Sequence, residues 1–245
     1  MKSSSSLLFA SIALLTSMSI EASDTKWTYS GAGGPTEWSK LSPETATCGG
    51  KNQSPINLTG FIRARLAPIQ FSYKALGNEV WNNGHTIQVN FAEGGSMHID
   101  GAQFDLKQVH FHAPSENQIN GKSYPLEGHF VHKDKDGNLA VIAVMYQEGA
   151  ENKSLTNVWN LMPHDADQKV ALTENLHPDA LLPKKRAYYR FNGSLTTPPC
   201  SEGVRWLVMK APVPVSKSQV ETFAQVIHHP NNRPIQSVNA RPVLK

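Results

Sequence analysis

Three histidines in one short stretch carry the clearest chemical signal in the sequence. His110 and His112 stand in the run QVHFHAPSE, and His129 stands in the run LEGHFVH. Alternate side chains of a β-strand point to the same face, so His110 and His112 are predicted to project together. The stretch between the two runs has turn residues at Asn120 and Gly121 and predicts a hairpin that brings His129 opposite the pair. Three neutral imidazoles without a carboxylate or thiolate form the ligand set of a catalytic zinc site, with a fourth position left for water.

The size and charge of the chain limit the number of domains and the kinds of partner that it can have. Its 245 residues suit one large all-β domain or two small ones. Charged residues make up only 18%, and 17 Gly and 16 Pro indicate many loops. The net charge of +3 gives no indication of a nucleic-acid partner. The one tight basic cluster, Lys184-Lys185-Arg186, is short and typical of a solvated turn.

The first 22 residues have the pattern of a signal peptide. Lys2 supplies the positive start, Leu7 to Leu15 form the apolar core, and Ala22 offers a small residue for cleavage. The apolar run is far shorter than the roughly 20 residues that a membrane span needs, and no later stretch approaches that length. We expect a soluble mature protein, residues 23–245, that is periplasmic or secreted and has no membrane span.

Export makes a disulfide between Cys48 and Cys200 the expected state, because they are the only two cysteines. Such a bond would close a loop of about 150 residues, to which the chain-entropy estimate assigns roughly 5 kcal/mol, a figure that strain in the native state usually lowers. The alternative is two free, buried thiols.

Short or alternating apolar runs recur about every ten residues and predict a mainly β chain in a single domain. Asp100-Gly101 and Asp136-Gly137 are typical hairpin turns between such runs. The run LAVIAVMYQ is apolar on both faces and predicts a central strand. The expected strands lie at 69–73, 85–91, 96–99, 103–112, 126–132, 139–147, 187–194 and 204–210.

Two short peripheral helices are also predicted. The first covers 152–161 and ends before Pro163. The second begins with a capping box formed by Ser216 and Gln219 and runs through Ile227. The side chains expected to face the core are Leu155, Val158, Trp159 and Met162 in the first helix and Val220, Phe223, Ala224 and Ile227 in the second.

Seven motifs along the chain together resemble those of the α-class carbonic anhydrases in their exported, bacterial form. The motifs are WTYSG (27–31), QSPINL (53–58), NGHTIQV (83–89), QVHFHAPSE (108–116), EGHFVH (127–132), GSLTTPPCSEGVRW (193–206) and NNRPIQ (231–236). The resemblance implies a twisted, mostly antiparallel sheet of about ten strands, with the metal at the floor of a conical cleft. It also implies a zinc enzyme that converts carbon dioxide reversibly into bicarbonate and a proton, and a homodimer.

The zinc ligands need partners that orient their rings. Glu127 lies two residues before His129 and Gln108 two residues before His110, so each shares the strand face of a ligand. The resemblance makes Glu127 accept the other ring N–H of His129, and the amide oxygen of Gln108 can do the same for His110. For His112, the resemblance implies the backbone carbonyl of Asn231.

The resemblance also implies a pair that orients the reactive hydroxide. An ionised Glu116 can only accept, so Thr196 would donate its proton to Glu116 and accept from the zinc-bound hydroxide. Thr197 is expected to contact bicarbonate. Carbon dioxide has little polarity, and its expected binding wall is apolar. The wall residues implied by the resemblance are Val131, Val141, Leu195, Val204 and Trp206.

Regenerating the hydroxide requires a proton acceptor that titrates near neutral pH, and histidine is the natural choice. His85 matches the proton-shuttle position of the family. Asn83 and Tyr29 are the expected members of its water network.

Two other functions fit part of the pattern. His110, His112 and Glu116 also match the start of a cupin metal motif, in which Glu116 would be a ligand and the protein an iron or manganese oxidoreductase. Flanking glycines and a second cupin motif are not apparent. The other alternative is a non-catalytic, periplasmic zinc-binding protein.

Overall fold

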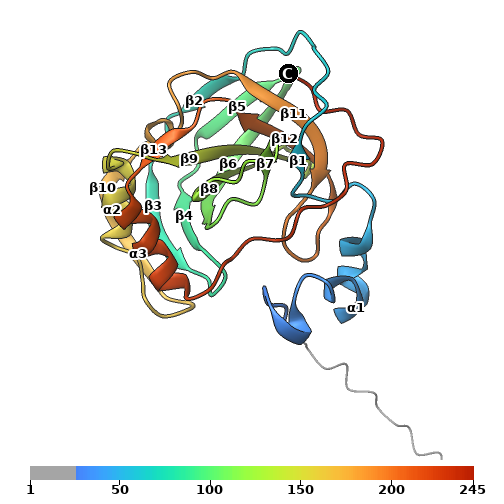
Figure 1. The fold of residues 1–245 in the computed structure, drawn as a ribbon. Helices are drawn as coiled ribbons and strands as arrows, with labels where there is room; N and C mark the ends of the chain where they lie inside the picture. The colour runs from blue at the N-terminus through green and yellow to red at the C-terminus, as the bar shows by residue number, and fades with distance from the viewer. Residues whose placement is uncertain (1–25) are drawn as a thin grey trace, which may run out of the picture.

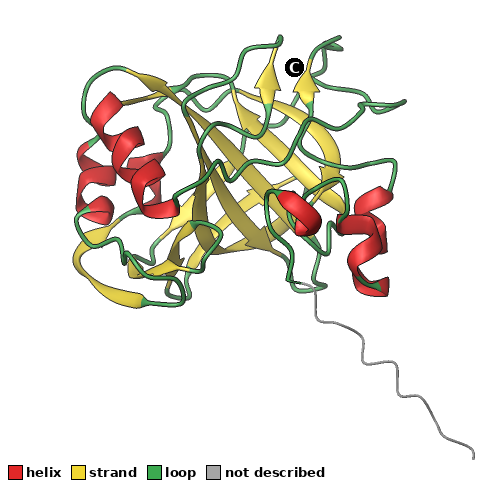
Figure 2. Ribbon diagram, turned by 60° about the horizontal axis from the view of Figure 1, so that its bottom comes forward, coloured by secondary structure: helices red, strands yellow, loops and turns green. Residues whose placement is uncertain are grey.

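The computed structural model describes residues 26–245, apart from the side chain of Asn175; the predicted signal peptide lies outside these residues. Figure 1 shows a twisted sheet through the middle of the molecule, and Figure 2 shows the helices at its periphery. The described part of the sheet has eleven strands. The predicted fold class is therefore confirmed: mainly β, with a large, mostly antiparallel sheet and short helices.

The strands of the large sheet and a separate two-stranded sheet account for most of the regular structure. The strands are β1 (Asn57–Leu58), β2 (Gln70–Tyr73), β3 (Gly77–Asn82), β4 (Ile87–Phe91), β5 (Gly95–Ile99), β6 (Ala102–His112), β7 (Gln118–Ile119), β8 (Leu126–Lys133), β9 (Leu139–Glu148), β10 (Lys169–Leu176), β11 (Tyr188–Ser194), β12 (Glu202–Met209) and β13 (Val213–Val215). The helices are η1 (Gly31–Gly33), α1 (Trp38–Leu41), η2 (Pro43–Gly49), α2 (Lys153–Trp159), η3 (Pro178–Leu181) and α3 (Lys217–Ile227).

The main path of the large sheet runs β10-β3-β4-β6-β8-β9-β12-β11, with β2, β5 and β13 attached beside it. Most neighbours are antiparallel, but β9 pairs in parallel with both β12 and β13. Strands β1 and β7 form a separate parallel pair. The predicted central strand is confirmed, because β9 lies inside the sheet and is buried on both faces along most of its length.

The hairpin that joins β6 to β8 positions the three histidines. Asn120 and Gly121 have φ angles of 51° and 78°, the left-handed conformation that a type I′ turn requires. Beyond this turn, β6 and β8 pair in an antiparallel register that places His110 opposite His129 and His112 opposite Glu127. The predicted hairpin is confirmed, and with it the approach of His129 to the other two histidines.

The two faces of the sheet bury separate apolar clusters. Ile142 and Val144 of β9 point into the larger cluster, which also contains Phe223 of α3. Val141 and Ala143 point into the smaller cluster on the other face. Val109 and Phe111 of β6 belong to the larger cluster, so the alternating His110 and His112 face the other way. This alternation separates the histidines from the helix-covered core.

Both predicted helices are present, with small differences. Asn152 caps α2 by accepting from the N–H groups of Ser154 and Leu155, and the helix ends at Trp159, two residues earlier than predicted. Ser216 and Gln219 form the predicted capping box of α3. The expectation that Ala224 faces inward is wrong: Ala224 is exposed, and Val226 is buried instead.

The sequence patterns missed the short strands β1, β7 and β13 and the longer strands β3 and β10. Strands β3 and β10 pair at one edge of the sheet. Residues 170, 171, 173 and 174 of β10 are all exposed, so this strand lacks the apolar alternation that identifies a half-buried strand.

None of the helices among residues 26–245 is long and apolar enough to cross a membrane.

Candidate metal centre

The imidazoles of His110, His112 and His129 converge on one point. One ring nitrogen from each lies within 4.8 Å of the others. His112 and His129 are almost completely buried, and His110 is half-buried. The neighbouring ring centroids lie 4.6–5.2 Å apart.

The other nitrogen of each ring has its own hydrogen-bond acceptor. His110 Nδ1 donates to Gln108 Oε1 at 2.8 Å, and His112 Nδ1 donates to the Asn231 carbonyl at 2.7 Å. His129 Nε2 donates to Glu127 Oε1 at 2.9 Å. The nitrogens left for a metal are therefore Nε2 of His110, Nε2 of His112 and Nδ1 of His129. Outer partners of this kind select the tautomer and the ring orientation of a ligand.

These nitrogens fit a zinc ion. Nε2 of His112 is buried without a hydrogen-bond partner among the described residues, which is costly unless a ligand satisfies it. Burial lowers the pKa of His110 and of His129 well below the usual value, so both rings are neutral and can bind a metal. Three neutral imidazoles with one open position is the donor set of catalytic zinc.

Glu127 is itself held in place. Asn117 donates to both of its carboxylate oxygens, from the backbone N–H at 2.8 Å and from the side-chain amide at 2.7 Å. Burial raises the pKa of Glu127 to about 7, while the Asn117 hydrogen bonds act in the opposite direction. The carboxylate that orients His129 is thus rigid as well as buried.

Glu116 lies beside the three histidines and is completely buried. Its Oε1 accepts from the backbone N–H of Arg233 at 2.9 Å, and its Oε2 is 3.4 Å from His112 Nε2. Burial raises the pKa of Glu116 to about 8, while the Arg233 N–H and the hydroxyl of Thr196 lower it. The structure therefore brings Glu116 and Thr196 together, although they are 80 residues apart.

A small cleft of about 140 Å³ opens onto the histidines. Its walls include His110, His112 and Thr197, together with Tyr29, Asn83 and His85. The predicted proton-transfer residues and one predicted substrate contact thus share a cavity with two of the three candidate ligands.

The five residues predicted to form the apolar wall also lie together. Val141, Val204 and Trp206 are buried in the smaller cluster, and Val131 and Leu195 pack against it. The ring of Trp206 meets the ring of His129 edge to face, with the centroids 4.9 Å apart. An apolar surface therefore adjoins the convergence point of the histidines.

His85 lies at the mouth of the cleft between aromatic rings. Its ring stacks on Trp27 at a centroid distance of 3.7 Å, and Tyr29 lies 6.4 Å away. Asn83 Oδ1 accepts from the backbone N–H groups of His85 and Thr86, which fixes the turn that presents His85. Partial burial lowers the pKa of His85, and the nearby His229 acts in the same direction.

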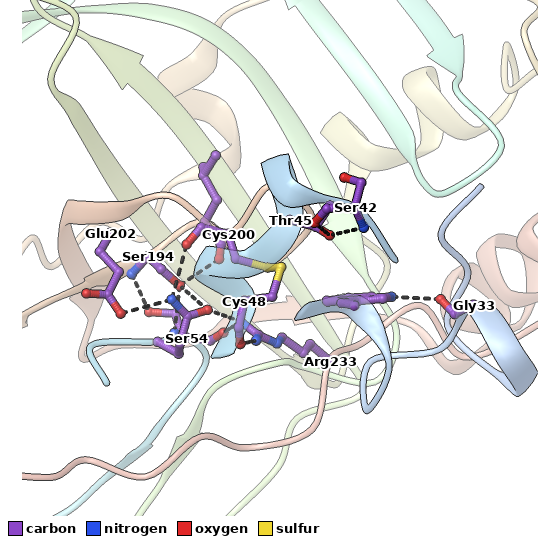
Figure 3. The surroundings of a disulfide bond; sticks show 12 residues. Gly33, Ser42, Thr45, Cys48, Ser54, Ser194, Cys200, Glu202 and Arg233 are labelled. Atoms are coloured by element: carbon purple, nitrogen blue, oxygen red, sulfur yellow. Dashed lines mark hydrogen bonds between the residues drawn. A yellow bond between two sulfur atoms is a disulfide. The ribbon is translucent and has the colours of Figure 1, made fainter. Parts of the chain in front are cut away.

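The predicted disulfide is present and braces the loop that carries Thr196 and Thr197. Cys48 and Cys200 are joined with an S–S distance of 2.07 Å (Figure 3). The backbone N–H of Cys200 donates to the carbonyl of Thr197 at 2.8 Å. Through Cys48, the bond ties this loop to the N-terminal segment.

A buried arginine connects the disulfide region to Glu116. The guanidinium of Arg233 donates to the carbonyl of Cys48 and to Gln53 Oε1, at 2.9 and 2.8 Å, and Figure 3 shows it beside Cys48. The backbone N–H of the same residue holds Glu116. The loop, the N-terminal segment and the metal centre therefore form one bonded network.

Comparisons with known proteins agree with this geometry. Residues 33–245 match the profile of the family described as eukaryotic-type carbonic anhydrase. A carbonic anhydrase of Pectobacterium carotovorum is 50% identical over 238 residues, which cover 96% of this chain and 98% of that protein. One from Neisseria gonorrhoeae is 48% identical over 90% of this chain and 88% of its own. The chain belongs to the carbonic anhydrase family.

Solved structures place it more closely among the α-class carbonic anhydrases. The α-carbonic anhydrase of Thermovibrio ammonificans in complex with the inhibitor sulfanilamide has a TM-score of 0.88 and 52% identity, covering 90% of this chain and 99% of that one. The chain is thus an enzyme of the carbonic anhydrase class, which acts on a small-molecule substrate. The cupin and non-catalytic alternatives are therefore set aside.

Sequence reasoning did not single out Trp27, Asn117 or Arg233 at this carbonic anhydrase site. Asn117 directly follows Glu116, so its position next to the histidine-rich motif was the one available signal. Trp27 and Arg233 lie in the resembling motifs WTYSG and NNRPIQ, but nothing in their local pattern shows that they contact His85 and Glu116.

Proposed function

We propose that the protein catalyses the zinc-dependent, reversible hydration of carbon dioxide to bicarbonate and a proton. The zinc ligands are His110, His112 and His129. One observation carries this proposal. In each of the three imidazoles, one ring nitrogen is hydrogen-bonded to the protein and the other points to a shared centre.

Bound zinc supplies a Lewis acid that makes its coordinated water reactive near neutral pH. The protein contributes orientation. Gln108, Glu127 and Asn231 keep the rings aimed at the metal. When Glu116 is ionised it can only accept, so Thr196 donates to it and the Thr196 oxygen is left to accept a hydrogen bond from the nucleophile. Thr197 contacts the bicarbonate product.

The apolar wall holds carbon dioxide without competing hydrogen bonds. Val131, Val141, Leu195, Val204 and Trp206 offer no charged group, and Trp206 lies against the ring of His129. An uncharged substrate loses little hydration on entering such a surface, whereas water is excluded from it. Bicarbonate carries a charge and leaves the apolar wall for solvent.

The proton leaves through His85, with Asn83 and Tyr29 ordering the water between this residue and the metal. His85 is only partly buried and lines the same cleft as His110, so it connects the interior to solvent. Its pKa is lowered from a value near neutral, which favours release of the proton to the surroundings.

We further propose that residues 1–22 are a signal peptide and residues 23–245 the catalytic domain of a periplasmic or secreted enzyme. The disulfide supports this location, because such bonds persist in oxidising compartments. A homodimer remains a prediction, to be checked by the mass of the protein in solution.

The test is stopped-flow hydration of carbon dioxide by protein of measured metal content, with a sulfonamide inhibitor as a control. We expect one zinc per chain and hydration that the sulfonamide suppresses. Stoichiometric zinc without hydration would contradict the proposal.

His85→Ala tests the proton route alone. We expect zinc content to be unchanged and turnover to fall roughly tenfold or more in dilute buffer, with partial rescue by added imidazole. His98→Ala is the matched control, because His98 is exposed on β5 and does not line the cleft. Unchanged turnover of His85→Ala in dilute buffer would remove this residue from the route.

A further inference from the structure

A second groove lies at the opposite end of the molecule from the metal centre. This basic groove has a volume of about 470 Å³ and is formed by parts of four segments, 61–69, 184–190, 208–210 and 243–245. Figures 1 and 2 show the C-terminus, which contributes Lys245, at the end opposite α1 and the N-terminal segment whose residues Trp27 and Tyr29 line the metal cleft. Anything bound in the basic groove therefore leaves the cleft open.

Positive charge is concentrated around this groove. Arg186, Lys210 and Lys245 line it, and five further basic residues stand in the same segments: Arg63, Arg65, Lys184, Lys185 and Arg190. The four segments contain no Asp or Glu. Among the described residues, two acidic side chains pair with these eight: Asp179 lies 3.0 Å from Arg186, and Asp100 lies 2.6 Å from Arg190. Without these eight residues, acidic residues outnumber basic ones in residues 26–245, so the positive charge of that range depends on the segments around the groove.

Apolar side chains accompany the cations. Ile62 is 53% exposed, one of the few large apolar side chains that are exposed among the described residues, and it stands directly before Arg63. Leu66, Pro68 and Ile69 line the groove itself. The ammonium groups of Lys245 and Lys210 lie over the rings of Phe61 and Tyr189, at 5.1 and 5.0 Å from the ring centroids. Long basic side chains over apolar surface are typical of a membrane interface.

We propose that the basic groove docks the enzyme onto a bilayer that carries anionic phospholipids. The lysines and arginines meet the headgroup phosphates, and Ile62 and Leu66 enter the boundary between headgroups and acyl chains. The exposed apolar residues favour a bilayer over a nucleic acid, whose phosphate backbone offers them no apolar partner. The inference depends neither on zinc nor on hydration, so it can fail while the proposed function holds.

The test is co-sedimentation of the protein with vesicles of phosphatidylcholine alone and of phosphatidylcholine mixed with phosphatidylglycerol. We expect binding to the mixed vesicles at about 50 mM salt, loss of binding at about 500 mM, and little binding to neutral vesicles. The triple variant K184A/K185A/K245A should bind the mixed vesicles about a hundredfold more weakly, because each cation near an anionic surface contributes about a fivefold gain.

The matched control is K51A/K133A/K153A, which removes three exposed lysines outside the groove. It should bind the mixed vesicles like the parent, and both triple variants should hydrate carbon dioxide normally. Equal weakening by the two triple variants would show a net-charge effect and overturn the proposal. So would equal binding to neutral vesicles, or displacement from mixed vesicles by inorganic phosphate or double-stranded DNA at matched ionic strength.

Discussion

The β6–β8 hairpin and the loop between β11 and β12 contribute to the same site, but they are held in place differently. The hairpin carries all three candidate ligands on two adjacent strands, with His110 and His129 directly opposite in register. The loop carries Thr196 and Thr197 and depends on distant groups: the disulfide to Cys48 and the hydrogen bond from Gln53 to the Cys200 carbonyl.

Because of this difference, we expect metal binding to depend on the hairpin and catalysis to depend on the loop. The ligand geometry follows from backbone hydrogen bonds within a hairpin, which are local and regular. The orientation of Glu116 and Thr196 follows from contacts between segments far apart in the chain. Changes in the hairpin should therefore abolish zinc binding, whereas changes in the loop should impair catalysis and leave zinc in place.

The largest expected effect is that of His110→Ala. Two imidazoles cannot hold the metal at a three-ligand site, so zinc should be lost, and with it all hydration. The loss of zinc affinity should exceed the roughly 10- to 100-fold that removal of an outer hydrogen-bond partner causes. Zinc analysis and chelator competition measure it. Retention of stoichiometric zinc by His110→Ala would show that this residue is not a ligand.

Thr196→Val should separate zinc binding from catalysis. Valine keeps the shape of threonine and removes the hydroxyl, so the nucleophile loses its acceptor while the hairpin is untouched. We expect full zinc content and a fall of roughly a hundredfold in kcat/KM, the usual cost of one positioned hydrogen bond. Zinc analysis and stopped-flow hydration of the same preparation measure both. Loss of zinc would mean that the loop also shapes the metal site.

Reduction of the Cys48–Cys200 disulfide should act on the loop alone. The bond joins residues 152 positions apart, so its loss should destabilise the fold by about 2–4 kcal/mol and lower the melting temperature. Turnover should fall while zinc is retained, because Thr196 and Thr197 lose their brace. A C48S/C200S variant treated with reductant is the control. An unchanged melting temperature, with both thiols shown to be free, would contradict this expectation.

The smallest expected effect is a loss of stability at acidic pH that comes from His132. Burial lowers the pKa of His132 to about 4, and the ring lies 2.7 Å from the hydroxyl of the buried Tyr73. Between about pH 6.5 and 4 the unfolded chain binds a proton that the folded protein does not, so the free energy of unfolding should decrease as the pH falls, by up to about 3 kcal/mol.

The variant His132→Gln removes this titration and keeps an acceptor for Tyr73. Chemical denaturation at pH 7 and at pH 4 should show a smaller loss of stability in the variant than in the parent. Equal losses would mean that His132 does not control the acid response.

Much of the hairpin was predictable because it obeys local rules. A period of two put His110 and His112 on one face, and Asn120-Gly121 supplied the turn. The capping box of α3 was also visible, because a cap and its helix lie within a few residues. Strand β10 was missed because its exposed residues carry no alternation, and its pairing with β3 is what makes it a strand.

The amino-acid sequence by itself determined the candidate ligand types, the common strand face of His110 and His112, and the single disulfide pairing. These depend on residue identity, on short spacings and on the presence of only two cysteines. Only the tertiary structure decided that Trp27 stacks on His85, that Arg233 holds Glu116, and that Arg186, Lys210 and Lys245 line one groove. Such contacts join segments tens to nearly two hundred residues apart. No local period encodes them, because they arise when the whole sheet packs.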